Sequence, residues 1–256
     1  MTTTELPGPF AAMVERVQPR HDRPLRRERP RYEDRGTPME GYLVAPDGMV
    51  GRRKAVLIFH AWMGVGENVE MRAEMLARLG YTAFCGDVYG AGVRPTTLAA
   101  MRAESERHYA DLALMRARAR AAADVLVDRG FVPEDIVVIG YCFGGTVALE
   151  LARDGDPFAG VVAFHPRLLR HEPADAGSTA APLLIVSGAE DDIVPDDDLT
   201  GFMDELRTSP SLDWRVSVHS GAPHAFTVPG TDRYRPLADA RSWREFVDFL
   251  DELAPI

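Results

Sequence analysis

Four stretches of the chain are apolar over four to seven consecutive residues, which is typical of strands buried on both faces of a sheet. They lie at residues 54–59, 136–139, 158–164 and 182–188, and shorter strand patterns follow at 81–85 and 214–219. Between them, apolar positions recur at helical spacing over residues 67–79, 96–129 with a break near Tyr109, 143–153, 196–207 and 236–253. Strands that alternate with helices of ten or more residues predict an α/β fold, in which helices cover both faces of a mostly parallel sheet.

The first thirty residues do not follow this alternation. Five prolines lie between residues 7 and 30, and five arginines gather between residues 23 and 31. Residues 1–35 hold eight Arg against six Asp and Glu, a net charge of +2. Because the whole chain carries −10, the rest carries −12. We therefore predict an arm over residues 1–30, partly disordered or packed on the body or a second subunit, and one domain over 31–256. A homodimer formed through the arm and a polyanion-binding arm are both open alternatives.

Residues 31–45 predict a β-hairpin that turns at 34–36, ahead of the first buried strand. The net charge of −10 gives a nucleic-acid partner no electrostatic support from the chain as a whole. The lack of an apolar run of 18 residues excludes a membrane-spanning segment. With only two cysteines, Cys85 and Cys142, and no leader pattern at Met1, we expect a reducing, cytoplasmic setting.

The strand at 136–139 leads into the sequence Gly140-Tyr141-Cys142-Phe143-Gly144, followed by an apolar helix. This is the nucleophile-elbow pattern, with Cys where Ser usually stands. The glycines are expected because a side chain at either position would collide with the adjoining strand or helix. A helix N-terminus behind Cys142 favours the reactive thiolate. The alternative is a small buried cysteine in a glycine-rich turn.

A nucleophilic thiol needs a base and an acid that orients the base. In a parallel sheet these groups belong on loops at the carboxyl ends of strands. The strand at 183–187 leads to Asp191 and the strand at 214–219 leads to His224, so the chain order is nucleophile, acid, histidine. Glu190 and Asp192 remain alternative acids. His21, His108 and His171 are expected to be surface residues.

The oxyanion formed on thiolate attack needs hydrogen-bond donors that are already in place. One is expected to be the backbone N–H of Phe143. The other should come from the loop after residues 54–59, most simply the N–H of Trp62, with Ala61 as the alternative. The substrate pocket is expected to include His60, Ala61, Tyr89, Arg94 and Phe226.

These motifs, together with Gly188 to Pro195, His224-Ala225-Phe226 and the Gly80-Tyr81 and Asp87 to Gly90 segments, resemble the dienelactone hydrolase family. The similarity runs from about residue 31 to the C-terminus. The resemblance implies an α/β-hydrolase fold without a large cap domain, no cofactor and no metal. It also implies a Cys-His-Asp triad that hydrolyses a small ester or lactone through an acyl-enzyme.

Some family features are missing from this sequence. The family's dienelactone enzyme has a glutamate that interacts with the resting thiol, where this chain has Ala61. Its two carboxylate-binding arginines fall near Ala91 and Val228, and Arg94 is the nearest substitute. We therefore expect an ester, lactone or thioester other than dienelactone. A catalytically degenerate binding protein and an acyltransferase or thioesterase using the same triad are the alternative functions.

Overall fold

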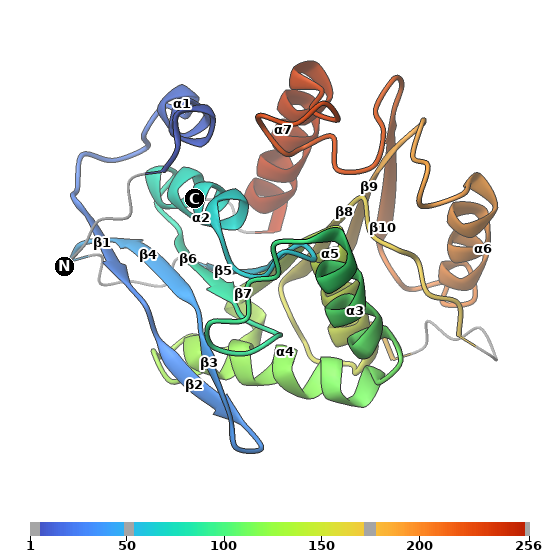
Figure 1. Ribbon diagram of the computed structural model, residues 1–256, viewed down its shortest axis with the longest axis horizontal. Helices are drawn as coiled ribbons and strands as arrows, with labels where there is room; N and C mark the ends of the chain where they lie inside the picture. The colour runs from blue at the N-terminus through green and yellow to red at the C-terminus, as the bar shows by residue number, and fades with distance from the viewer. Residues whose placement is uncertain (1–5, 49–53, 172–177, 254–256) are drawn as a thin grey trace. The chain divides into compact units, whose positions relative to one another are not determined.

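The computed structural model describes residues 6–48, 54–171 and 178–253, and the chain divides into two compact units, Met1–Ile136 and Val137–Ile256 (Figure 1). The first unit contains α1 (Gly8–Arg16), β1 (Leu25–Glu28), β2 (Arg31–Asp34), β3 (Thr37–Glu40), β4 (Tyr42–Pro46), β5 (Ala55–Phe59), α2 (Glu67–Arg78), β6 (Thr82–Gly86), α3 (Leu98–Tyr109), α4 (Leu112–Val127) and the short 3-10 helix Pro133–Asp135. The second contains β7 (Ile136–Tyr141), α5 (Phe143–Arg153), β8 (Gly160–Phe164), β9 (Leu183–Gly188), α6 (Asp196–Leu206), β10 (Trp214–His219) and α7 (Pro236–Leu253).

The strands of the second unit are all parallel and lie in the order β7-β8-β9-β10. Every residue of β7, β8 and β9 is buried, as the apolar runs predict. Because the strands are parallel, the segments that follow them emerge at one edge of the sheet. That edge carries four residues of chemical interest: Cys142 after β7, His165 after β8, Asp191 after β9 and His224 after β10.

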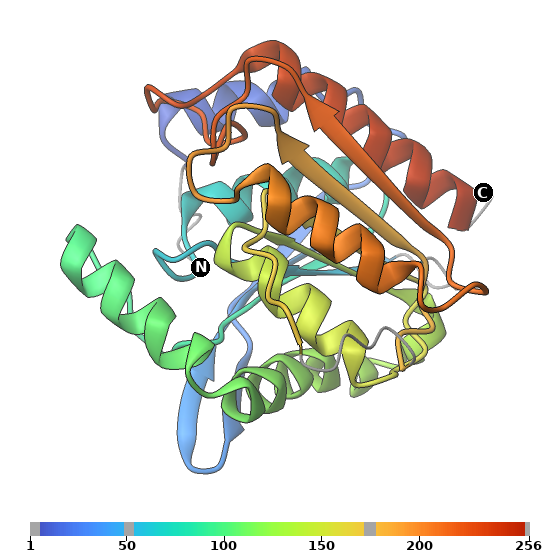
Figure 2. The same cartoon turned by 90° about the vertical axis from the view of Figure 1, so that its right-hand side faces the viewer.

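The strands of the first unit lie in the order β1-β4-β6-β5. β5 and β6 are parallel, so the loops that follow them, residues 60–66 and 87–97, leave the sheet on the same side. Figure 1 shows α2 and α4 on opposite sides of these strands. The expected break in the helical segment 96–129 is confirmed at Ala110, and Figure 2 shows the change of direction between α3 and α4. None of the helices in the described residues combines the length and the apolar character needed to cross a membrane.

The hairpin expected over residues 31–45 is shorter than predicted. β2 pairs with β3 in a separate two-stranded sheet, and the chain then breaks at Gly41 before β4 pairs with β1 and β6. A Cβ atom on Gly41 would lie 2.3 Å from the Phe84 ring and 2.5 Å from the Cys85 carbonyl oxygen. The break therefore allows the chain to pass close to β6 as it moves from one sheet to the other.

The basic N-terminal segment contacts acidic residues of α2. Residues Leu25–Glu28 form strand β1, which the sequence analysis did not predict, and Arg27 makes two hydrogen bonds of 2.7 and 2.8 Å to the carboxylate of Glu74. Arg29 similarly lies 2.9 Å from Glu70. Within the first unit, the charge of this segment is thus complemented by the helix it packs on.

Candidate active site

Cys142 stands at a sharp turn between β7 and α5, as the elbow pattern predicts. Its backbone has a φ of 56° and a ψ of −116°, a conformation that costs a non-glycine residue about 1–3 kcal/mol. The turn is so tight that a Cβ on Gly140 would lie 1.9 Å from the carbonyl oxygen of Gly144. A Cβ on Gly145 would lie 3.0 Å from the Pro166 side chain. The close approach of β7 and α5 therefore requires glycine at position 140, and the segment after β8 leaves little room for a side chain at position 145.

The structure brings together the three side chains expected to form a triad. The sulfur of Cys142 lies 3.0 Å from Nε2 of His224. On the other side of the ring, Nδ1 of His224 lies 2.9 Å from Oδ2 of Asp191 and 3.2 Å from Oδ1. His224 and the Asp191 carboxylate are buried, whereas Cys142 is partly exposed. The arrangement joins a nucleophile, a base and an orienting acid in one hydrogen-bonded chain.

Of the three acids considered from the sequence, Asp191 is the one in contact with His224. Its Oδ1 also accepts hydrogen bonds from the backbone N–H groups of Ile193 and Val194, at 2.9 and 3.0 Å. These bonds fix the position of the carboxylate beside the His224 ring. Glu190 is exposed, and Asp192 points to solvent in an ion pair with Arg233 at 2.6 Å.

The surroundings of His224 favour its charged form. Burial lowers the pKa of the ring, but hydrogen bonds to Asp191 and Cys142 and their negative charges outweigh burial and raise it to about 10. Because a carboxylate accepts only, Nδ1 carries a proton, and Nε2 faces the sulfur. A protonated imidazole at this distance stabilises negative charge on the sulfur, which is the nucleophilic form of a cysteine.

The second cysteine has a different environment. Cys85 is fully buried in β6 and its sulfur donates to the carbonyl of Val69 at 3.3 Å. Burial raises the pKa of the Cys85 thiol well above its usual range. Of the two thiols, only Cys142 combines exposure with a neighbouring base.

In the first unit, the loop that follows β5 borders a groove of about 530 Å³. The residues that line this groove are Trp62, Leu98, Ala99, Arg102 and Ala103. Leu98 is 73% exposed, and Met63 and Val93 are also exposed. The groove therefore combines apolar side chains, Trp62 among them, with one guanidinium, that of Arg102.

Other residues expected in the pocket lie behind the surface. The expectation that His60 lines the pocket is wrong, because its ring is fully buried. Tyr89 and Phe226 are at most 2% exposed, and Ala61 is 8% exposed. The Arg94 guanidinium lies 2.8 Å from the Val93 carbonyl oxygen and 3.7 Å from the Asp87 carboxylate, so it neutralises a buried charge.

The sequence model of the dienelactone hydrolase family matches residues 39–254. The chain belongs to the dienelactone hydrolase family. A solved structure named m3DLH is 35% identical, with a TM-score of 0.85, over 90% of this chain and 98% of that one. The crystal structure of a dienelactone hydrolase-like promiscuous phosphotriesterase from metagenomic libraries is 32% identical, with a TM-score of 0.83 and the same coverage. A probable 2-oxo-3-(5-oxofuran-2-ylidene)propanoate lactonase of a Bradyrhizobium species is 26% identical over 218 residues, 82% of this chain and 87% of that protein.

Membership of the dienelactone hydrolase family establishes the α/β-hydrolase fold and the class of protein, a hydrolase of esters or lactones. The mostly parallel sheet with helices predicted from the sequence is confirmed. In the described ranges, no group of three or more His, Cys, Asp or Glu side chains could hold a metal ion. Residues 172–177, part of the polar loop after β8, lie outside the described residues.

Several residues in or near the site were not found from the sequence. The sequence motifs do not include His165, which directly follows β8 at the sheet edge that carries Cys142, Asp191 and His224. Its ring lies 5.1 Å from the ring of His224, edge to face, and its Nε2 lies 2.8 Å from the Thr227 hydroxyl. His108 was expected at the surface and is fully buried. The rule that places reactive groups after parallel strands would have selected His165.

Proposed function

We propose that this member of the dienelactone hydrolase family cleaves a small carboxylic ester or lactone through an acyl-enzyme on Cys142. The observation that carries the proposal is the hydrogen-bonded chain from the Cys142 sulfur through His224 to Asp191, with separations of 3.0 and 2.9 Å. In the first step, the sulfur attacks the ester carbonyl carbon, and the carbonyl π electrons move to its oxygen. Asp191 keeps the His224 ring oriented throughout.

The negative oxygen of the tetrahedral intermediate is proposed to accept hydrogen bonds from the backbone N–H groups of Phe143 and Trp62. Phe143 is the first residue of α5, where the helix dipole favours an anion. When the intermediate collapses, the C–O bond breaks and Nε2 of His224 gives its proton to the departing alkoxide. Water then attacks the thioester carbon while His224 takes a proton from it. The C–S bond breaks, so the acid leaves and the sulfur of Cys142 again faces a protonated His224.

Alkylation of the thiol tests this proposal. Iodoacetamide is expected to abolish the hydrolysis of p-nitrophenyl acetate in proportion to the carboxamidomethyl groups found on Cys142, because a reactive cysteine must be an accessible thiolate. Cys85, which is fully buried, serves as the internal control and should stay unmodified in the native protein. The measurement is residual activity against mass-spectrometric labelling of each cysteine. Full activity after complete labelling of Cys142 would rule the mechanism out, and an unreactive Cys142 would favour a degenerate binding protein.

We propose further that the groove beside Trp62 receives an apolar part of the substrate. Trp62 belongs both to the proposed oxyanion loop and to the groove wall, so a substrate held at one is near the other. Replacing Leu98 with alanine is expected to lower kcat/KM for p-nitrophenyl hexanoate about 5- to 10-fold. The reason is that part of the leucine side chain is lost from its apolar contact with the substrate. Hydrolysis of p-nitrophenyl acetate should change less than about twofold.

The matched control for this variant is Leu237→Ala. Leu237 is also a largely exposed leucine near a helix N-terminus, 60% exposed in α7, and it does not border the groove. Both esters should be hydrolysed at the wild-type rate by Leu237→Ala. Equal losses on the two esters in Leu98→Ala would contradict the assignment of the groove to the substrate.

A further inference from the structure

The fully buried imidazole of His60 has a defined tautomer. Its Nδ1 lies 2.7 Å from the carbonyl oxygen of Ala61, which only accepts hydrogen bonds, so Nδ1 must carry a proton. Its Nε2 lies 3.1 Å from the backbone N–H of Val88, which only donates, so Nε2 must be bare. The two partners together select the neutral ring with its proton on Nδ1. Burial, the largest influence, agrees with this, since it lowers the pKa of His60 to about 4.

The hydrogen bond from His60 reaches the peptide unit whose other end is the proposed oxyanion donor. The carbonyl of Ala61 accepts from His60 and also from the backbone N–H of Gly64 at 3.1 Å. A trans peptide unit is planar, and its C=O and N–H groups point in opposite directions. The N–H that shares this plane belongs to Trp62. Whatever fixes the Ala61 carbonyl therefore fixes the direction of the Trp62 N–H.

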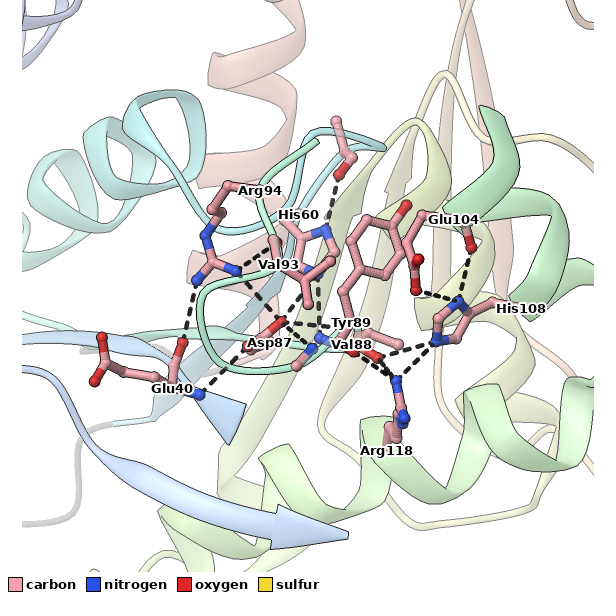
Figure 3. Close-up of polar contacts among 12 residues, drawn as sticks. Glu40, His60, Asp87, Val88, Tyr89, Val93, Arg94, Glu104, His108 and Arg118 are labelled. Carbon is pink, nitrogen blue, oxygen red and sulfur yellow. Dashed lines mark hydrogen bonds and ion pairs between the residues drawn. The ribbon is translucent and has the colours of Figure 1, made fainter. Parts of the chain in front are cut away.

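The Val88 segment that supports His60 is itself held by several side chains, as Figure 3 shows. Arg118 donates to the carbonyl oxygens of Val88 and Tyr89 at 2.8 and 2.7 Å. The Asp87 carboxylate accepts from the N–H groups of Tyr89 at 3.0 Å and Gly90 at 3.2 Å. His60 thus spans from a firmly held segment after β6 to the peptide unit after β5.

We propose that His60 is a positioning residue, which fixes the direction of the Trp62 N–H, the proposed oxyanion donor, by holding the Ala61 carbonyl. This inference rests on the proposed function of Trp62 as an oxyanion donor. It assigns His60 no contact with substrate, in keeping with its burial. Because the donor must be aimed before the reaction begins, loosening its peptide unit slows formation of the tetrahedral intermediate more than it weakens ground-state binding.

Two substitutions of His60 separate this role from a general contribution to packing. The amide nitrogen of asparagine can occupy the place of Nδ1 and still donate to the Ala61 carbonyl. The amide of glutamine reaches the place of Nε2 instead, so it can meet Val88 and leaves the Ala61 carbonyl without this donor. The measurement is the burst of p-nitrophenolate from p-nitrophenyl acetate, which reports acylation, at several ester concentrations and with the melting temperature of each variant.

The expected result is a 10- to 100-fold slower burst in His60→Gln and a burst within about fivefold of wild type in His60→Asn, at similar ester affinity. This compares with the 10²- to 10³-fold effect of losing an oxyanion donor outright. His108→Gln is the matched control, since His108 is also a fully buried histidine whose Nε2 lies 3.0 Å from the Val88 carbonyl, which keeps the hydrogen bond from Arg118. It should acylate within about threefold of wild type.

Equal burst rates in the two His60 variants, or a burst in His108→Gln as slow as in His60→Gln, would overturn the positioning role. So would a loss in His60→Gln that appears only as weaker ester affinity. Failure of the underlying mechanism has a different signature, because Cys142→Ala would then keep its activity. Loss of activity in Cys142→Ala together with equal rates in His60→Asn and His60→Gln would contradict the inference about His60 alone.

Discussion

Cys142→Ala is expected to hydrolyse p-nitrophenyl acetate at least about 10³-fold more slowly than the wild-type protein. The substitution removes the atom that forms the acyl-enzyme, and members of such a triad act as a unit, so their loss is far larger than that of a single hydrogen bond. The remaining donors and His224 can at most assist attack by water. Steady-state rates and the absence of a p-nitrophenolate burst are the measurements.

Cys85→Ala is the matched control, because it removes the other thiol from a site fully buried in β6. Its activity should equal that of the wild type, with at most a modest loss of stability from the small cavity. If Cys142→Ala hydrolysed the ester as fast as Cys85→Ala, the triad could not be the catalytic group. The two variants together would also show which thiol accounts for iodoacetamide sensitivity.

Cys142→Ala also tests the electrostatic interaction between Cys142 and His224. In the wild type, burial lowers the pKa of His224, but hydrogen bonds and charges of Asp191 and Cys142 raise it to about 10. Removing the sulfur removes two of the causes that raise the pKa, so His224 should titrate at a lower pH in Cys142→Ala than in the wild type. Histidine proton resonances followed from pH 5 to 11 measure this. An unchanged pKa would mean that the sulfur does not interact with the ring.

The sequence was most informative where a local pattern determines the structure. Buried parallel strands are apolar along their whole length, so β5, β7, β8 and β9 could be located from their runs of consecutive apolar residues. The break between α3 and α4 is also local, since the Asp111 side chain caps α4 by accepting from the N–H of Leu114 at 2.9 Å.

Features that depend on residues far apart in the chain could not be predicted in this way. β1 reads Leu-Arg-Arg-Glu and becomes a strand only because β4 offers it an edge. The break at Gly41 depends on the Phe84 ring, 43 positions later. His108 appeared to belong to the surface because its partners, Val88 and Arg118, are brought to it by the fold.

The functional residues divide in the same way. The elbow motif selected Cys142, and the rule about strand ends, together with the order nucleophile, acid, histidine, selected Asp191 and His224. The role inferred for His60 required two distances, to Ala61 and to Val88, that no spacing encodes. The sequence analysis expects His60 in the pocket, whereas its ring is fully buried in the structure.

Gly140→Ala is expected to lower the free energy of unfolding by about 4 kcal/mol or more, or to prevent folding. The added Cβ would lie 1.9 Å from the carbonyl oxygen of Gly144 and 2.1 Å from its carbonyl carbon, and both are backbone atoms that no side-chain rotation can move aside. Such overpacking requires α5 to shift away from β7, which disturbs the buried contacts of both elements. For a chain of 256 residues this corresponds to a drop in melting temperature of roughly 8 to 16 °C. Because the same shift would displace Cys142, the folded fraction should also lose most of its esterase activity.

The control for this prediction is Gly8→Ala, at the start of α1, where an added Cβ meets no atom of the described residues within 4 Å. Alanine is the better helix former, so this variant should be as stable as the wild type or slightly more stable. Thermal unfolding followed by circular dichroism compares the two. If Gly140→Ala melted within 2 °C of Gly8→Ala, the close approach of β7 and α5 could not be the reason that glycine stands before Cys142.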